Sequence, residues 1–160
     1  MTPKRRRERG QTLVEFALVT PLIVFMVVAF IDMGRAVWTY TTITNAARQG
    51  ARVAAVNQLT TSADCDESIP ITDPTTPHWT IYGCAIAAGG PLGLTTSNVG
   101  VSYAAPPGTT VSCSPSVNVG CIASVTITYA YSPSTPILNG FIHSMTFTST
   151  SQEPVERVFP

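Results

Sequence analysis

The chain has few charged residues and few of the side chains that carry out catalysis. Only 11% of its 160 residues are Asp, Glu, Lys or Arg, and its two histidines, His78 and His143, lie far apart in the sequence. It contains no G-x-S-x-G or H-E-x-x-H motif and no glycine-rich loop of the kind that holds phosphate. We therefore expect a protein that is not an enzyme, has no cofactor or metal, and takes no small-molecule substrate.

Positive charge is scarce everywhere except at the start of the chain. Residues 1–10 hold five Lys or Arg against one Glu, whereas the rest of the chain holds four against eight, so the formal net charge of zero hides two opposite blocks. Residues 58–160 contain a single basic residue, Arg157, and six acids. An acidic outer part of this kind argues against a nucleic-acid partner.

One long apolar run follows the basic block. Nineteen residues from Leu13 to Ile31 contain a single charged side chain, Glu15. As a helix they would span about 28 Å, which is close to the thickness of the hydrocarbon core of a bilayer. The basic residues before the run should stay in the cytoplasm, so we expect a single-pass membrane protein with its N-terminus inside and its C-terminus outside.

Three simpler explanations of this region compete with a functional one. A cleaved secretory signal would have a shorter apolar core and a small-residue cleavage site. A twin-arginine signal is suggested by Arg5-Arg6-Arg7, but Glu8, Arg9 and Gly10 replace the apolar residues expected after the pair. A permanent membrane anchor explains everything except the junction between the two blocks.

The junction places a glycine, Gly10, at the end of the basic block and an acid, Glu15, five residues later inside the apolar run. Acids in membrane-spanning segments usually have a function and a specific partner. If the chain were cut after Gly10, the new α-amino group of Gln11 would be such a partner, one helical turn away or on a neighbouring subunit.

With this junction the sequence resembles type IV pilin-like proteins, most closely the TadE-like pseudopilins of the tight-adherence (Tad) pilus. The resemblance lies in RRRERGQTLVEFALVTPLIVFMVVAFIDMGRAVWTYTTITNAARQGARVAAV and, more weakly, in VTITYAYSPSTPILNGFIHSMTFTST. It implies cleavage by a prepilin peptidase between Gly10 and Gln11, which would stand where many type IV pilins have Phe. It also implies that Glu15 guides subunit docking and that Phe16 occupies a position where Tad pilins favour an aromatic residue.

The helix should continue beyond the membrane. In residues 32–57 apolar side chains recur every three or four positions, which indicates one helix face. We expect one helix from about Thr12 to Val56, kinked at Pro21. Its outer half should pack on the chain's own outer domain, and its membrane half against the same helix of other subunits, where small residues permit close approach. These small residues are Ala17, Ala29, Gly34 and Ala36.

Composition changes after Asn57. Residues 58–160 hold 11 of the 13 prolines and are rich in Ser and Thr, which is typical of strands joined by turns. Alternating apolar and polar residues predict strands at 99–104, 122–131 and 145–150, the last two forming an antiparallel pair. Residues 59–80 and 87–97 are predicted to be loops, with a break at Gly89-Gly90-Pro91.

All four cysteines lie in this outer part, and none belongs to a C-x-x-C motif. Outside the cytoplasm two disulfides are the default, and three pairings are possible. We favour the local one, Cys65 with Cys84 and Cys113 with Cys121. The acidic stretch Asp64-Cys65-Asp66-Glu67 is better explained as a solvated loop than as a calcium site, because it lacks EF-hand spacing.

Together these features predict an α+β, type IV pilin-like fold of four parts. They are a basic leader (1–10), the transmembrane half of a long helix (11–31), its amphipathic outer half (32–57), and a small disulfide-bonded antiparallel β domain (58–160). The expected function is that of a pilin-like structural subunit used in Tad pilus assembly and adhesion. Its expected partners are the membrane, prepilin peptidase, other pilin subunits and the Tad machinery. It should lie in the inner membrane, or outside the cell once in a pilus. The alternative is a permanently anchored extracytoplasmic binding protein that does not polymerise.

Overall fold

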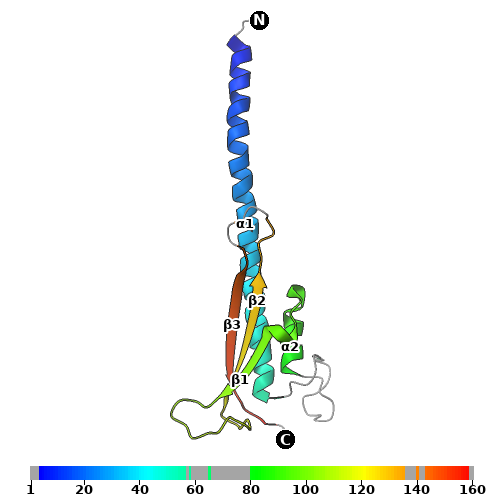
Figure 1. Cartoon of the computed structure of the whole chain (residues 1–160), viewed down its shortest axis with the longest axis vertical. Coiled ribbons are helices and arrows are strands. Elements are labelled where there is room, and N and C mark those ends of the chain that lie inside the picture. Colours follow the sequence, from blue (N-terminus) through cyan, green and yellow to red (C-terminus); the bar gives the residue numbers. More distant parts are fainter. Residues whose placement is uncertain are drawn as a thin grey trace. The chain divides into compact units, whose positions relative to one another are not determined.

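The computed structural model describes residues 4–56, 58, 65, 80–135, 140 and 143–158, with their side chains from residue 10 onward. The chain divides into two compact units (Figure 1). The first unit comprises Met1–Val37 and Ser132–Ser144, and the second comprises Trp38–Tyr131 and Met145–Pro160. The fold is α+β, as the sequence predicts: one long apolar helix at the N-terminus, and a small antiparallel sheet with two disulfides.

The helix α1 runs from Lys4 to Val56 and has 53 residues, which corresponds to about 80 Å. It ends where the sequence predicts but begins eight residues before Thr12, because the basic block is itself helical. Pro21 lies inside α1, which continues on both sides of it. The kink expected at Pro21 stays a prediction.

Three antiparallel strands form a sheet with the order β1-β2-β3. The strands β1 (Val99–Ala104) and β2 (Ile122–Tyr131) have the predicted bounds. The third strand, β3 (Met145–Pro154), also pairs with β2 as expected, but it extends four residues beyond Thr150. The extension exists because Ser151 to Pro154 remain in register with β2, where Glu153 lies opposite Ala123.

A second helix, α2 (Ile81–Ala88), was not predicted. Thr80 caps it, because its side-chain oxygen accepts a hydrogen bond of 3.0 Å from the Gly83 amide. Residues 87–97, predicted to be a loop, instead contain the end of α2 and two short 3₁₀ helices, η1 (Gly90–Leu92) and η2 (Thr96–Asn98). The predicted break is correct, since α2 ends at Gly89.

The core of the second unit lies between the sheet and the last turns of α1, with α2 beside them (Figure 1). The sheet contributes large apolar side chains, whereas α1 contributes mainly alanines, which bring the helix close to the sheet. The approach is close at Gly50, because a Cβ atom there would lie 2.9 Å from Cγ1 of Val125. Central core residues are Ile43, Ala46, Ala47, Ala51, Ala54, Ile81, Ala123, Val125 and Ile127.

The C-terminal segment closes the end of α1. The amides of Glu156 and Arg157 both donate to the carbonyl of Ala55, at 2.9 and 3.3 Å. The side-chain amide of Gln58 donates to the carbonyls of Ala54 and Arg157. The last carbonyls of a helix have no partner within it, so these bonds satisfy groups that would otherwise need water.

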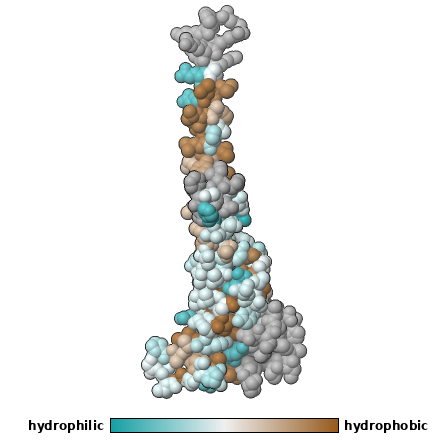
Figure 2. All heavy atoms as spheres, viewed as in Figure 1, coloured by the Kyte–Doolittle hydropathy of each residue, from teal (hydrophilic) through white to brown (hydrophobic). Residues whose placement is uncertain are grey.

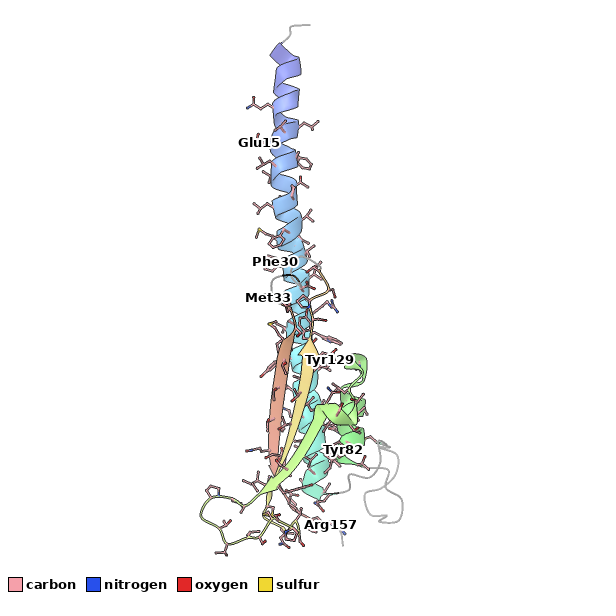
Figure 3. The ribbon with its side chains drawn as sticks, viewed as in Figure 1. Glu15, Phe30, Met33, Tyr82, Tyr129 and Arg157 are labelled. Carbon is pink, nitrogen blue, oxygen red and sulfur yellow. A yellow bond between two sulfur atoms is a disulfide. The ribbon has the colours of Figure 1, made fainter. Side chains whose placement is uncertain are left out.

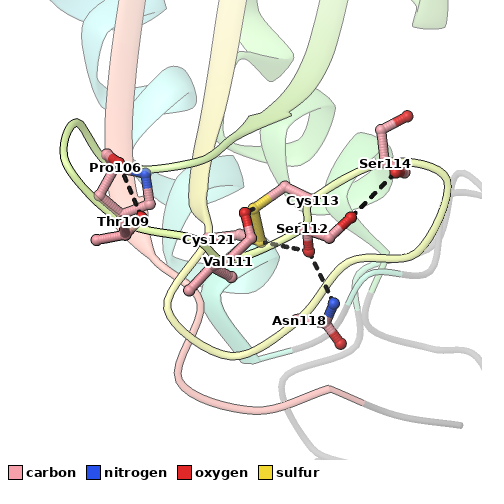
Figure 4. Close-up of a disulfide and its surroundings, with 8 residues drawn as sticks. All are labelled: Pro106, Thr109, Val111, Ser112, Cys113, Ser114, Asn118 and Cys121. Atoms are coloured by element: carbon pink, nitrogen blue, oxygen red, sulfur yellow. Dashed lines mark hydrogen bonds between the residues drawn. A yellow bond between two sulfur atoms is a disulfide. The ribbon is translucent and has the colours of Figure 1, made fainter.

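Both disulfides of the second unit have the local pairing that we favoured. Cys65 is bonded to Cys84, and Cys113 is bonded to Cys121. Near the Cys113–Cys121 disulfide, the side-chain amide of Asn118 donates to the Ser112 carbonyl at 2.7 Å (Figure 4). Residues 64, 66 and 67 of the acidic stretch lie outside the described part of the chain.

Candidate functional site

The most apolar part of the chain is also the most exposed. Along the first unit, large side chains of the run from Leu13 to Ile31 stand in open space, with Leu18 at 76% and Phe16 at 71% exposure. Figure 2 shows this surface as a brown band along the N-terminal half of α1. A contiguous exposed apolar surface of this kind marks a site that something else covers.

Length and composition allow this helix to cross a membrane. It is the one described helix that meets both criteria, and none of its most apolar window is buried. The core helix of a soluble protein can be equally apolar, but its apolar face is buried. The exposure of α1 therefore favours a membrane anchor over a core helix, and it matches the predicted membrane segment.

Glu15 lies within this apolar surface. Its side chain points away from α1 into open space (Figure 3), and no described group forms a hydrogen bond or ion pair with it. A carboxylate in an apolar surface is costly in lipid unless a cation or hydrogen-bond donor meets it. The geometry thus leaves Glu15 available for a partner from outside the described structure.

The other junction residues are also exposed and helical. Gly10 and Gln11 lie in the same stretch of α1 as Glu15 and Phe16. Positions four apart face the same side of a helix, which places Gln11 one turn before Glu15. The Thr20 hydroxyl donates to the Phe16 carbonyl at 2.7 Å, so it is satisfied inside the apolar run.

A buried acid, Asp32, immediately follows the apolar run and was not singled out from the sequence. Its carboxylate accepts hydrogen bonds from the amides of Ser134 and Thr135, both at 3.4 Å, and from the Thr135 hydroxyl. Arg35 lies 3.8 Å away on the next turn of α1. An acid at the end of an apolar run was the only signal in the sequence, because the hydrogen-bond donors Ser134 and Thr135 are 102 and 103 residues away.

These contacts favour the charged form of Asp32, which lies just beyond the apolar run. The hydroxyl of Thr135 lowers the pKa of Asp32 below its ordinary value of 3.8, although burial acts in the opposite direction. A lowered pKa means that the ionised carboxylate stabilises the folded state at every pH above the ordinary pKa. That contribution is lost as the pH falls through the lowered pKa. The attachment is therefore made by the carboxylate form at neutral pH.

The second unit offers no comparable chemistry in its described part. No group of three or more His, Cys, Asp or Glu that could hold a metal occurs among the described residues. Tyr82 and Tyr103 are partly buried against the core, which is the structural role that aromatic residues usually have. Burial raises the pKa of Tyr103 to about 12.

Comparison with known proteins bears on the N-terminal third of the chain. A family model described as TadE-like protein matches residues 10–52, which include Gly10, Gln11, Glu15 and Phe16. No curated protein and no solved structure matches the chain. The matched segment lies entirely within α1. The resemblance of residues 10–52 to TadE-like proteins is thus confirmed.

Proposed function

We propose that this chain is a pilin-like subunit that is inserted in the inner membrane with its N-terminus inside. In this proposal a prepilin peptidase cuts after Gly10, and the mature chain enters, or supports from below, a Tad-type pilus used for adhesion. The observation that carries the proposal is the exposed apolar half of α1, within a segment that matches the TadE-like family.

The exposed run needs two successive environments in this account. Apolar surface in water costs roughly 25 cal/mol per Å², so the run from Leu13 to Ile31 is stable only when covered. Lipid covers it first. In an assembled pilus the equivalent helices of neighbouring subunits take the place of lipid, and the small residues Ala17 and Gly34 allow their backbones to approach.

Glu15 sets the register in which this otherwise uniform apolar surface packs against a neighbouring helix. Apolar contacts alone do not fix the register of one helix against another. A cut after Gly10 creates a positive α-amino group on Gln11, close to where the apolar surface begins. Pairing this group with Glu15 of a neighbour neutralises two charges that would be costly in an apolar environment, and it selects one register.

Replacement of Glu15 by Ala tests the proposal. Removal of the charge makes the run more apolar, so membrane insertion should be preserved, whereas incorporation into sheared pilus fractions should be lost. Immunoblots of membrane and pilus fractions measure both. The matched control is Glu156→Ala, which removes an exposed carboxylate from the second unit and should leave incorporation unchanged.

Normal incorporation of Glu15→Ala would refute the role of the ion pair. Absence of the wild-type chain from every pilus and pilus-base fraction would favour a different function, that of a permanently anchored extracytoplasmic binding protein.

A further inference from the structure

Aromatic side chains gather at one end of the second unit. Tyr40, near the start of this unit's part of α1, meets Phe147 of β3 edge to face, with the ring centres 6.2 Å apart. Phe147 also stacks on Tyr131, the last residue of β2, at 5.6 Å. In the sheet Tyr131 lies opposite Met145, the first residue of β3. Three elements thus bring apolar side chains together where β2 ends and β3 begins.

This end is also where the second unit leaves large apolar side chains uncovered. Four such residues are exposed in the described part of the unit, and three of them belong to this end: Trp38 at 50%, Tyr40 at 49% and Met145 at 37%. The fourth is Val119, in the loop between β1 and β2. Exposed apolar residues that gather at one end of a folded unit mark a contact surface.

The exposed side chains surround α1 at this level. Residues two apart on a helix point about 200° apart, so Trp38 and Tyr40 lie on nearly opposite sides of α1. Tyr40 is on the side of the sheet, because it touches Phe147, and Trp38 is therefore on the side away from it. A set that surrounds the helix suits a medium better than it suits one flat partner. We name this set the aromatic belt, and it comprises Trp38, Tyr40, Tyr131, Met145 and Phe147.

The chemistry of the belt suits the boundary between lipid and water. Trp and Tyr combine an apolar ring with one polar group, and they are enriched at the headgroup level of membranes for that reason. In the sequence, α1 has no charged residue between Arg35 and Arg48, β2 has none, and the only one in β3 is Glu153, near the opposite end of that strand. Lipid contact at the belt therefore requires no ion to leave water.

The level of the belt along α1 agrees with this boundary. Trp38 follows Ile31, the last residue of the apolar run, by seven residues, which is about 10 Å of helix. A helical side chain covers the turn before its own Cα, so the indole reaches back by about 5 Å. The headgroup layer on each side of a bilayer is about 5 to 7 Å thick. The exposed Met33 and Val37 continue the apolar surface from the run to the belt.

We propose that the aromatic belt is a lipid-interface anchor, which holds its end of the second unit in the headgroup layer of the outer leaflet. The apolar run gives the chain its membrane-spanning segment, and the belt sets the depth at which that segment rests. A shift of the chain in either direction would take the rings out of the layer that they prefer. The proposal rests on the membrane insertion and orientation of α1 proposed above.

Tryptophan fluorescence tests the proposal without a foreign label. The chain has two tryptophans, and Trp79→Phe, outside the described residues, leaves Trp38 as the only one. This full-length variant is reconstituted in phosphatidylcholine vesicles that contain lipids spin-labelled either at the headgroup or deep in the acyl chain. Two reference variants lack both native tryptophans and carry a new one on α1. Leu22→Trp, in the middle of the apolar run, gives the deep reference, and Asn45→Trp, at an exposed position, gives the aqueous one.

Trp38 should be quenched more strongly by headgroup labels than by acyl-chain labels. Leu22→Trp should show the reverse order, and Asn45→Trp should be quenched by neither label. Met145→Trp, in the background without native tryptophans, tests the sheet side of the belt at an exposed position. Headgroup labels should quench it as strongly as they quench Trp38, and the emission of both should lie at shorter wavelength than that of Asn45→Trp.

Three outcomes would overturn the proposal, and they are distinguishable. If acyl-chain labels quench Leu22→Trp but Trp38 is quenched no more than Asn45→Trp, α1 spans the bilayer and the belt does not contact lipid. Emission of Trp38 at short wavelength in that case would assign the belt to contacts between copies of the chain. If Trp38 is quenched but Met145→Trp is not, the sheet takes no part in an anchor. If Leu22→Trp is not quenched, membrane insertion itself fails, and the anchor fails with it.

Discussion

The two halves of α1 show opposite relations between hydrophobicity and burial. In the first unit the helix carries large apolar residues such as Phe16, Leu18 and Phe30, and these are exposed. In the second unit it carries mainly small residues, and Ala46, Ala47, Ala51 and Ala54 are fully buried. The more apolar half is thus the one that the chain itself leaves uncovered.

The difference follows from what covers each half. Alanines allow the helix to approach its own sheet closely, and the sheet supplies the bulky partners Val125 and Ile127. The large side chains of the first half protrude on many sides of the helix, which suits a partner that surrounds it, such as lipid or several neighbouring helices. The second half of α1 therefore suits contact with its own sheet, and the first half suits contact with lipid or with several helices at once.

The largest difference between the halves should appear when the same residue is truncated in each. Ile127 is fully buried between the sheet and α1, so Ile127→Ala should lower the free energy of unfolding of the second unit by about 2 to 5 kcal/mol. Ile23 is 54% exposed on the first half, and Ile23→Ala should leave that value unchanged. Urea unfolding in detergent, followed by near-ultraviolet circular dichroism, measures both. Equal effects would mean that the exposed half also belongs to a packed core.

A charge placed on each half should separate lipid contact from water contact. Leu22 is at the middle of the apolar run, and Leu22→Arg should cost about 2.5 to 3.5 kcal/mol of insertion free energy. Asn45→Arg, on an exposed position of the second half, should cost nothing. The fraction of chain resistant to carbonate extraction measures insertion. Full retention of Leu22→Arg in the membrane would argue against lipid around this half.

The smallest effect concerns two glycines of α1, Gly34 and Gly50, whose replacement by Ala should change stability with opposite signs. Gly50→Ala places a Cβ 2.9 Å from Val125 and 3.2 Å from Ala85, and the crowding should lower the stability of the second unit by about 1 to 2 kcal/mol. At Gly34 a Cβ meets no described atom within 4 Å, so Gly34→Ala should stabilise the helix by up to about 1 kcal/mol.

Thermal unfolding in detergent distinguishes the two glycine variants. A stabilising effect at Gly50 would contradict close packing against the sheet. A destabilising effect at Gly34 would show that this position has a contact of its own.

Local patterns in the sequence predicted most of the fold. Apolar and polar alternation located β1 and β2, and helical spacing located the end of α1 at Val56. The last residues of β3, Ser151 to Pro154, have no such pattern, and pairing with β2 alone makes them a strand. The helix α2 escaped prediction because its eight residues include Gly83 and are too few to show a period.

The candidate site also contains residues that local patterns predicted and residues that they did not. The apolar run and Glu15 could be recognised because their signal lies within a few residues. The role of Asp32 could not, because Thr135, whose hydroxyl binds it, is 103 positions away and only the folded chain brings them together. A single sequence shows which residues are unusual in their local context, but it does not show which distant residues they contact.

The central claim, that the exposed half of α1 is a mature assembly surface, is tested most directly by N-terminal sequencing of this chain from sheared pili or from the pilus base. The account predicts one N-terminus, at Gln11. An intact basic leader on the assembled chain would contradict it, because the α-amino group that Glu15 requires would then not exist.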